Sequence, residues 1–286
     1  MELVSIITPS FNSEKFIAET IRSVQNQTYQ NWEMIIVDDC STDATIAIVE
    51  KMALLDNRIQ LFQSEKNSGT GIARNRALQK AKGRYISFLD ADDLWKPQKL
   101  EIQINFLKNN NFPFTFSFYD CINEQGKELS KRVEAPRNLS YRQLFFCNYV
   151  GNLTGIYDVN HFGKIAISSI RKRQDWMLWL IILKKVKSAK PIPESLAFYR
   201  IRENSISASK LDLLKHNFGV YRKFHGFNLV YSLLCMSGFL FTQLLIKPRY
   251  IKSINFPRLL LSNDNFLVKV KFKPDSRYNS IAFLIF

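Results

Sequence analysis

The chain has little cysteine, histidine, glycine or proline for its 286 residues, and each shortage argues against a class of protein. With 10 Gly, 9 Pro and 46% hydrophobic residues, it is neither collagenous, linker-like nor intrinsically disordered. Four cysteines without a C-x-x-C pair argue against a disulfide framework or a zinc site. The three histidines lack metal-ligand spacing, and no nucleophile elbow, Walker A or dinucleotide-binding motif occurs.

The start of the chain also lacks a basic segment followed by an apolar one. Without such a secretory signal, the bulk of the chain is predicted to stay in the cytoplasm. Reduced thiols fit that compartment.

Acidic residues are scarce in the last third of the chain. The whole sequence has 40 Lys and Arg against 25 Asp and Glu, a formal charge of +15. Residues 200–286 hold 14 basic and 4 acidic residues, a net charge of +10, which leaves 26 and 21, or +5, for residues 1–199. A basic surplus favours an anionic partner, such as nucleic acid, a phosphorylated metabolite or an acidic membrane surface. This asymmetry predicts that residues 1–199 carry the chemistry and that residues 200–286 bind the anionic partner.

Short β-branched runs alternate with helical patterns in the first 95 residues. The predicted strands are Leu3–Thr8, Glu33–Val37, Ile59–Phe62 and Tyr85–Leu89. The predicted helices include Phe16–Val24, Ile46–Met52 and Thr70–Ala81, the last closed by Gly83 at positive φ. This alternation predicts an α/β fold with a mostly parallel sheet flanked by helices.

Beyond Lys96 the pattern becomes less regular. Helices are predicted at Leu100–Leu107 and Gln174–Val186, and a strand at Phe114–Tyr119. The stretch Asn123–Pro136 has the composition of a polar loop.

Polar and acidic residues follow three of the predicted parallel strands. They are Pro9–Asn12, Asp38–Asp39 and Asp90–Asp93. Because ligands bind beyond the carboxyl ends of such strands, the three segments are expected at one site. Carboxylates two residues apart, as in Asp90 and Asp92, can hold Mn²⁺ or Mg²⁺ against phosphate oxygens. A solvated acidic turn is the simpler alternative.

The run Gly226–Ile246 holds 21 residues without a charge. Basic residues flank it: Arg222, Lys223, Lys247, Arg249 and Lys252. The run is long enough to span a bilayer, but its polar residues favour a helix lying in the interface of an anionic leaflet. A buried packing helix is the alternative.

Several short segments together resemble the inverting family 2 glycosyltransferases of the GT-A fold. In order, they are Val4–Asn12, Gln27–Tyr29, Ile36–Asp43, Asn67–Gly69, Ala73–Asn75, Gly83–Ile86 and Phe88–Asp93. The match returns at Gln174–Trp176 and at Tyr199–Arg200, with Ser205 and Ser207. After about residue 210 it gives no guidance for single residues.

The resemblance implies roles for the matched residues. The residues expected to contact the nucleotide sugar are Pro9, Phe11, Asn12, Asp38, Asp39, Arg74 and Asp90. Of these, Asp38 or Asp39 would bond the uracil, Asp90 would face the ribose, and Arg74 would help hold the nucleotide sugar.

The remaining implied roles are chemical. Asp92 would ligate the metal on the diphosphate, and Asp175 would be the catalytic base. On the sequence alone, Asp175 beside Arg171–Arg173 is more typical of a surface ion pair. Two residues depart from the family pattern: Gln174 stands where an acidic residue is usual, and Arg202 where a histidine is frequent.

The sequence therefore predicts an inverting, metal-dependent transferase of the GT-A fold, working in O-antigen or other bacterial surface polysaccharide synthesis. It would move a hexose, favouring UDP-glucose or UDP-galactose as the UDP-sugar donor, to a lipid-diphosphate-linked saccharide acceptor. Its cofactor would be Mn²⁺ or Mg²⁺, its place the cytoplasmic face of the inner membrane, and nucleic acid would not be a partner. Residues 1–210 would form the GT-A domain, and 211–286 a basic, partly apolar tail that associates with the membrane.

Within that domain, residues 1–95 would bind the nucleotide sugar, and 96–210 would hold the acceptor and the base. The alternative is a non-catalytic α/β protein that binds nucleotide or nucleic acid through a basic tail. The acidic strand ends argue against it, because they would repel phosphate without a metal. A nucleotidyltransferase would need a Gly-rich basic N-terminal loop, which the chain lacks.

Overall fold

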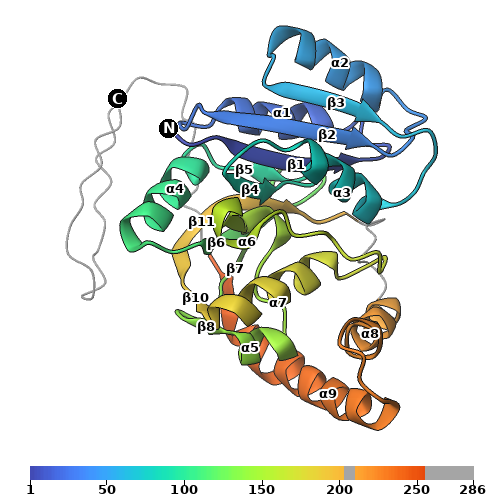
Figure 1. Ribbon diagram of the computed structural model, residues 1–286, viewed down its shortest axis with the longest axis vertical. Coiled ribbons are helices and arrows are strands. Elements are labelled where there is room, and N and C mark those ends of the chain that lie inside the picture. Colours follow the sequence, from blue (N-terminus) through green and yellow to red (C-terminus); the bar gives the residue numbers. More distant parts are fainter. Residues whose placement is uncertain (203–209, 255–286) are drawn as a thin grey trace, which may run out of the picture. The chain divides into compact units, whose positions relative to one another are not determined.

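A ten-stranded sheet forms the centre of the computed structural model, which describes residues 1–202 and 210–254 (Figure 1). Including a separate two-stranded sheet, β8–β10, the strands are β1 (Val4–Ser10), β2 (Trp32–Asp38), β3 (Ile59–Gln63), β4 (Tyr85–Phe88), β5 (Leu94–Trp95), β6 (Phe114–Ile122), β7 (Glu128–Val133), β8 (Leu139–Ser140), β9 (Ile156–Asp158), β10 (Ser188–Ala189), β11 (Pro191–Arg200) and β12 (Ile251–Ser253). The main order of strands in the large sheet is β12-β7-β6-β9-β4-β1-β2-β3. Strand β11 lies off this path and pairs with both β6 and β5.

Helices cover both faces of this sheet. They are α1 (Ile17–Gln25), α2 (Thr45–Leu55), α3 (Thr70–Lys80), α4 (Lys99–Asn110), α5 (Tyr141–Phe146), α6 (Val159–Phe162), α7 (Gln174–Val186), α8 (Lys210–Gly219) and α9 (Leu229–Phe241), with shorter turns η1 (Asn152–Thr154), η2 (Val220–Phe224), η3 (Thr242–Ile246) and η4 (Lys247–Tyr250).

The two halves of the sheet differ in direction. Strands β3, β2, β1 and β4 are parallel, as the α/β alternation predicts. Strand β9 then runs antiparallel to both β4 and β6, and β7 runs antiparallel to β6. The carboxyl ends of the parallel strands therefore share one edge, and the mixed half extends the sheet beside it.

Alternating side chains of the parallel strands pack into two hydrophobic cores, one on each face of the sheet. Ile7 and Ile35 face a core completed by α3, α5, α7 and α9, whereas Ile6 and Ile36 face one completed by α1, α2 and α4. Strands β1 and β2 are buried on both sides, which is why they read as continuous apolar runs.

Most of the predicted elements are confirmed, and α7 has the predicted bounds. The predicted polar loop Asn123–Pro136 is wrong, because it contains β7. Gly83 is not a cap at positive φ: α3 ends at Lys80, and a Cβ at Gly83 would come within 2.6 Å of the Ser5 nitrogen. The glycine is needed for close approach of two backbones.

Helices α8 and α9 belong to the same compact unit as the sheet. The predicted boundary at residue 210 divides a transferase domain from a membrane-associating tail by function. It does not coincide with a boundary between packing units, and the division of function stays a prediction. Ser205, Ser207 and the part of the predicted tail after residue 254 lie outside the described residues.

Candidate active site

The loops that follow β1 and β2 are cross-linked at the carboxyl edge of the sheet. Asn12, at φ +46°, donates its N–H to Ser41 Oγ (2.8 Å) and accepts the Thr42 N–H at Oδ1 (2.9 Å). Phe11 beside it is 47% exposed, an unusual position for a large apolar side chain. Pro9–Asn12 therefore lies against the Asp38–Asp39 segment, as the strand ends predict.

Each carboxylate of Asp38–Asp39 is held by protein donors. Asp38 is fully buried and accepts the hydroxyls of Ser10 (2.8 Å) and Ser41 (2.6 Å). Asp39 accepts the main-chain N–H groups of Ser68–Gly69 at 2.9 and 2.7 Å. Asp38 thus joins two strand ends, and Asp39 orders the turn that leads into α3.

Asp90 follows β4 and is held by an arginine from α3. Arg74 Nη2 lies 2.5 Å from Asp90 Oδ1, and the Asn152 amide donates to the same oxygen at 3.1 Å. Through Nη1, Arg74 also donates to Gln174 Oε1 (2.9 Å) at the start of α7. One buried guanidinium therefore connects Asp90 to the residue before Asp175.

Asp92 is paired with the second residue that departs from the family pattern. Arg202 Nη2 lies 2.7 Å from Asp92 Oδ2. The Nε atoms of Arg74 and Arg202 are both buried and without a hydrogen-bond partner in the described part of the chain. The guanidiniums of Arg74 and Arg202 thus flank Asp90 and Asp92, and each has one N–H donor that bonds nothing in the described residues.

Arg200 at the end of β11 fixes the shape of the Asp90–Asp93 turn. Its N–H donates to Asp93 Oδ1 (2.9 Å), its Nε to the Asp92 carbonyl (2.7 Å), and its Nη2 pairs with Glu19 (2.6 Å). The side chain is 1% exposed. Such a buried, fully bonded arginine holds backbone in place.

Carboxylates crowd this turn. Burial is the main cause that raises the pKa of Asp92, and it raises the pKa of Asp93 further, with a contribution from the neighbouring Asp90 and Asp92 charges. A cation placed here would relieve that repulsion.

A divalent metal fits this site only together with a substrate. No group of three His, Cys, Asp or Glu side chains in residues 1–202 and 210–254 could hold a metal alone. Mg²⁺ is commonly held by one or two carboxylates plus substrate phosphates. Asp92, whose side chain is 19% exposed, offers such a hard oxygen ligand.

Asp175 lies in the first turn of α7, half-buried, after Arg173 at φ +66°. Its Oδ2 accepts the Asn148 amide at 2.8 Å. Burial, followed by several nearby groups that include Asp93 and Asp175, raises the pKa of Tyr119, so this tyrosine lies near both carboxylates. The fold thus brings Asp175 to the same region as the strand-end carboxylates.

Gln174, which stands where the family pattern has an acidic residue, bonds the same arginine that holds Asp90. The side chain is buried, accepts from Arg74, and packs against α3, where a Cβ at Gly71 would come within 2.3 Å of Gln174 Nε2. Asn148 and Asn152 had no signal in the sequence, because single amides form no motif. Arg200 belongs to the matched Tyr199–Arg200 pair, but the resemblance assigned it no role.

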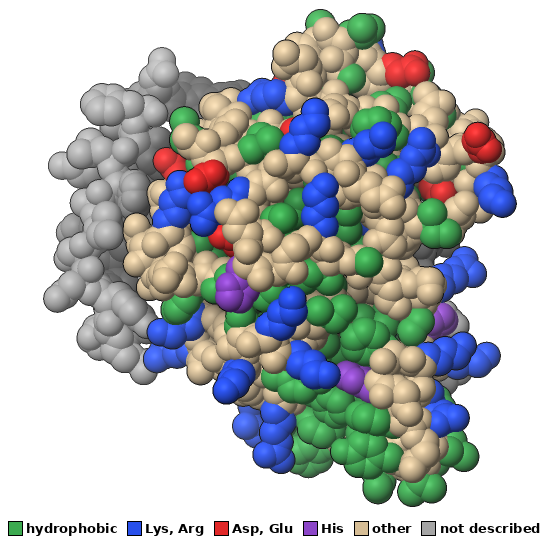
Figure 2. Space-filling model, viewed as in Figure 1, with side chains coloured by type: hydrophobic (Ala, Val, Ile, Leu, Met, Phe, Trp, Pro, Cys, Tyr) green, Lys and Arg blue, Asp and Glu red, His purple; other side chains and the backbone are tan. Residues whose placement is uncertain are grey.

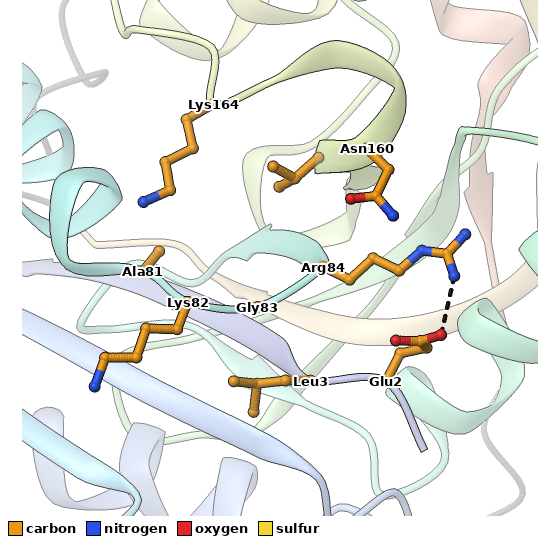
Figure 3. A pocket seen from close by; sticks show the side chains of 9 residues that line it. Glu2, Leu3, Ala81, Lys82, Gly83, Arg84, Asn160 and Lys164 are labelled. Atoms are coloured by element: carbon orange, nitrogen blue, oxygen red, sulfur yellow. Dashed lines mark hydrogen bonds and ion pairs between the residues drawn. The ribbon is translucent and has the colours of Figure 1, made fainter.

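A separate hollow of about 530 Å³ lies at the opposite, amino-terminal end of the parallel strands (Figure 3). Lys82, Arg84 and Lys164 line it, and Arg84 pairs with Glu2 (3.0 Å) and Asp158 (2.9 Å). It holds none of the predicted site residues.

Comparison with known proteins identifies the family. The family model described as Glycosyl transferase family 2 matches residues 5–164. The chain belongs to this family. Family 2 membership makes it a glycosyltransferase and disfavours the non-catalytic binding protein that composition left open.

Two similar proteins are glycosyltransferases by name. TuaG of Bacillus subtilis, named as a glycosyltransferase of teichuronic acid biosynthesis, is 42% identical over 233 residues, covering 82% of this chain and 92% of TuaG. WfgD of Escherichia coli, named UDP-Glc:alpha-D-GlcNAc-diphosphoundecaprenol beta-1,3-glucosyltransferase, is 38% identical over 223 residues, covering 78% and 86%.

The fold of this family 2 enzyme also matches solved structures. Residues 1–349 of S. aureus TarS in complex with UDP-GlcNAc align with a TM-score of 0.62 at 20% identity, covering 85% of this chain and 73% of that fragment. A mannosyltransferase from Pyrobaculum calidifontis in complex with GDP-Man and Mn²⁺ aligns at 0.57, with 16% identity, covering 85% and 70%. The predicted GT-A fold is therefore confirmed.

Proposed function

We propose that this glycosyltransferase moves a hexose from a UDP-sugar to a lipid-diphosphate-linked saccharide, with inversion, in bacterial surface polysaccharide synthesis. The observation that carries this proposal is the pairing of two carboxylate sites through one arginine. Asp90 and Asp175 belong to different elements, yet Arg74 contacts both Asp90 and the neighbour of Asp175.

The donor would bind over the carboxyl edge of β1, β2 and β4. Pro9, Phe11, Asn12 and Asp38 or Asp39 would surround the nucleotide, and Asp90 would face the ribose. The two guanidiniums of Arg74 and Arg202, each with an unused buried donor, suit a diphosphate. Asp92 would hold Mn²⁺ or Mg²⁺, which as a Lewis acid stabilises the charge that develops on the leaving diphosphate.

Asp175 would act on the acceptor. A carboxylate within hydrogen-bond reach of the acceptor hydroxyl takes its proton as the oxygen attacks the anomeric carbon. Inversion needs one such base, because the attack displaces the nucleotide directly from the opposite face. Asp175 follows Gln174 in the first turn of α7, and Gln174 accepts a hydrogen bond from Arg74, which also holds Asp90.

The choice of substrates rests on relatives. WfgD and the similar WfaP, 35% identical over 237 residues, both carry names that specify UDP-Glc and a GlcNAc-diphosphoundecaprenol. UDP-glucose is therefore the first donor to test, ahead of UDP-galactose, with undecaprenyl-diphosphate GlcNAc as the acceptor.

We also propose that the enzyme docks at the cytoplasmic face of the inner membrane through α9. Its inner side packs on the protein, with Cys235 and Phe239 buried and the rings of Phe239 and Trp176 5.8 Å apart. The outer side of α9, which continues into η3, is apolar and exposed: Leu229, Val230, Leu233, Leu234 and Phe241 in α9, and Leu244 and Leu245 in η3. Figure 2 shows this patch of hydrophobic side chains with lysines and arginines at its border.

A helix with one packed side and one apolar side suits the membrane interface more than a span. By length and composition, the described helix Leu229–Tyr250 could cross a membrane, and 22% of its apolar window is buried. The contact of α9 with α5 would have to break for a span to form, since Gly238 lies against the Phe146 ring.

The test is transfer from a panel of labelled UDP-sugars to a synthetic lipid-diphosphate acceptor, followed by linkage and anomer analysis. UDP-glucose should give a product with inverted configuration. Retention of configuration, or no transfer from any UDP-sugar, would overturn the proposal.

A further inference from the structure

One loop of the second half connects the predicted base to the segment that follows α9. The loop runs from Cys147 to Val150, between α5 and η1. It carries Asn148, which has no role in the family resemblance and yet donates a hydrogen bond to Asp175 at 2.8 Å.

The orientation of the Asn148 amide is determined by its other bond. Its Oδ1 accepts the Val150 N–H at 3.1 Å, so the amide must turn its NH₂ group toward Asp175 Oδ2. The carboxylate of Asp175 receives a donor that fixes its rotation, which leaves Oδ1 for a substrate hydroxyl.

The loop is in turn held by the residues after α9. Lys247 Nζ donates to the Asn148 carbonyl at 2.9 Å, and the Cys147 thiol donates to Gln243 Oε1 at 3.5 Å. The rings of Tyr149 and Tyr250 meet edge-on, with centroids 5.4 Å apart. Three successive loop residues therefore contact η3 and η4.

We propose that Asn148 is a positioning residue for Asp175, and that Lys247 holds Asn148 in place. This inference rests on the proposed function, in which Asp175 is the base. A lipid-linked acceptor that approaches along α9 would then meet a base whose orientation depends on the residues at the end of that helix.

Among the described residues, the groups that interact electrostatically with Asp175 include the guanidinium of Arg173 before α7 and the hydroxyl of Tyr119 on β6. Lys247 stands behind Asn148, whose carbonyl it holds. In Asn148→Asp, a second carboxylate would oppose ionisation of Asp175. The acid limb of the kcat profile should therefore move to higher pH, which a purely structural role would not cause.

The decisive experiment is a double-mutant cycle of Asn148→Ala and Asp175→Asn, with kcat and UDP affinity measured for each variant. Asn148→Ala should lower kcat about tenfold or more and leave UDP affinity unchanged, because a base out of place loses reactive geometry. In the Asp175→Asn background it should have no further effect.

The outcomes separate the two claims. Suppose that Asp175→Asn is impaired but both Asn148 variants keep the wild-type kcat and pH profile. Only the positioning role of Asn148 would then be overturned. A further loss from Asn148→Ala in the Asp175→Asn background would overturn it as well. Wild-type activity of Asp175→Asn would instead overturn the base assignment of the proposed function.

Lys247→Met should repeat the Asn148→Ala effect in weaker form. Lys252→Met, which removes the same charge from an exposed position in β12, is the matched control and should not change kcat. Equal kcat for the two lysine variants would remove Lys247 from the proposal.

Discussion

Asp92→Ala removes the carboxylate that we propose as the metal ligand, and it should abolish nearly all transfer. EDTA should do the same to the wild type until Mn²⁺ or Mg²⁺ is restored, because the leaving diphosphate then lacks its Lewis acid. The measurement is initial rate against metal concentration. Glu50→Ala, an exposed carboxylate on α2, is the control and should behave as wild type. Full activity in EDTA would contradict the metal role.

Asp175→Asn keeps the shape of the side chain and removes the proton acceptor. Transfer should fall about 10²-fold or more in kcat, the range that general base catalysis contributes. UDP affinity, measured by calorimetry, should persist because the proposed nucleotide contacts lie on other elements. A wild-type rate would contradict the assignment of Asp175 as the base.

Single residues also show where sequence reasoning ends. Asp90, Asp92 and Arg74 stand in recognisable segments, so their proximity could be predicted from strand ends and resemblance. Asn148 could not, because its position depends on a loop held from both sides by distant elements. The same is true of Arg200, whose match carried no role until its bonds to the turn were visible.

At the scale of elements, Gly83→Ala tests the close approach of β1 and the segment before β4. A Cβ would meet Ser5 N at 2.6 Å and the Leu3 carbonyl at 2.8 Å, both of them backbone atoms that cannot turn aside. We expect a loss of about 1–3 kcal/mol in the free energy of unfolding, measured by urea denaturation.

Gly219→Ala is the matched control for Gly83→Ala. Gly219 has helical φ of −59° and nothing within 4 Å of an added Cβ, so alanine should be neutral or stabilise by roughly 0.4–1 kcal/mol. Equal stability of the two alanine variants would mean that the strands can separate at no cost.

The elements that the sequence predicted well are those with a continuous apolar run. Strands β1, β2 and β4 are buried along their whole length, and α7 is buried over most of its length. Strand β7 was missed because its polar side chains, such as Ser130 and Lys131, give it the composition of a loop. Its pairing with β6 and β12 is a tertiary effect that no local pattern carries.

The outer side of α9 should bind lipid, so Leu233→Glu and Leu244→Glu should weaken membrane binding. These side chains are 56% and 68% exposed, and burying a leucine contributes about 1.5–3 kcal/mol. Each variant should lower the partition coefficient about tenfold or more, measured by flotation with vesicles that contain phosphatidylglycerol.

Leu55→Glu provides the control for α9. Leu55 is 82% exposed on α2, away from the proposed membrane side, and its variant should float as the wild type does. If all three glutamate variants float equally, the apolar side of α9 has another role.

At the scale of the whole molecule, the charge of +15 predicts salt-dependent attachment. A basic residue near an anionic leaflet contributes about 1 kcal/mol, and the screening length falls from about 8 Å at 0.15 M salt to about 3 Å at 1 M. Vesicle binding should therefore weaken between these concentrations without disappearing, since α9 contributes apolar contacts. Membranes should release part of the enzyme to a high-salt wash; extraction by detergent alone would indicate a span.

The contacts of Arg200 also determine when the site can form during synthesis. This residue bonds Asp93 from 107 positions later in the chain and Glu19 from 181 positions later. A ribosome that has released only the first 95 residues has therefore made the acidic turn without the side chain that shapes it. Such long-range closure slows folding, because the chain must order a large loop before the contact forms. The acidic turn of the donor-binding half therefore reaches its final shape only after the chain has been made as far as Arg200.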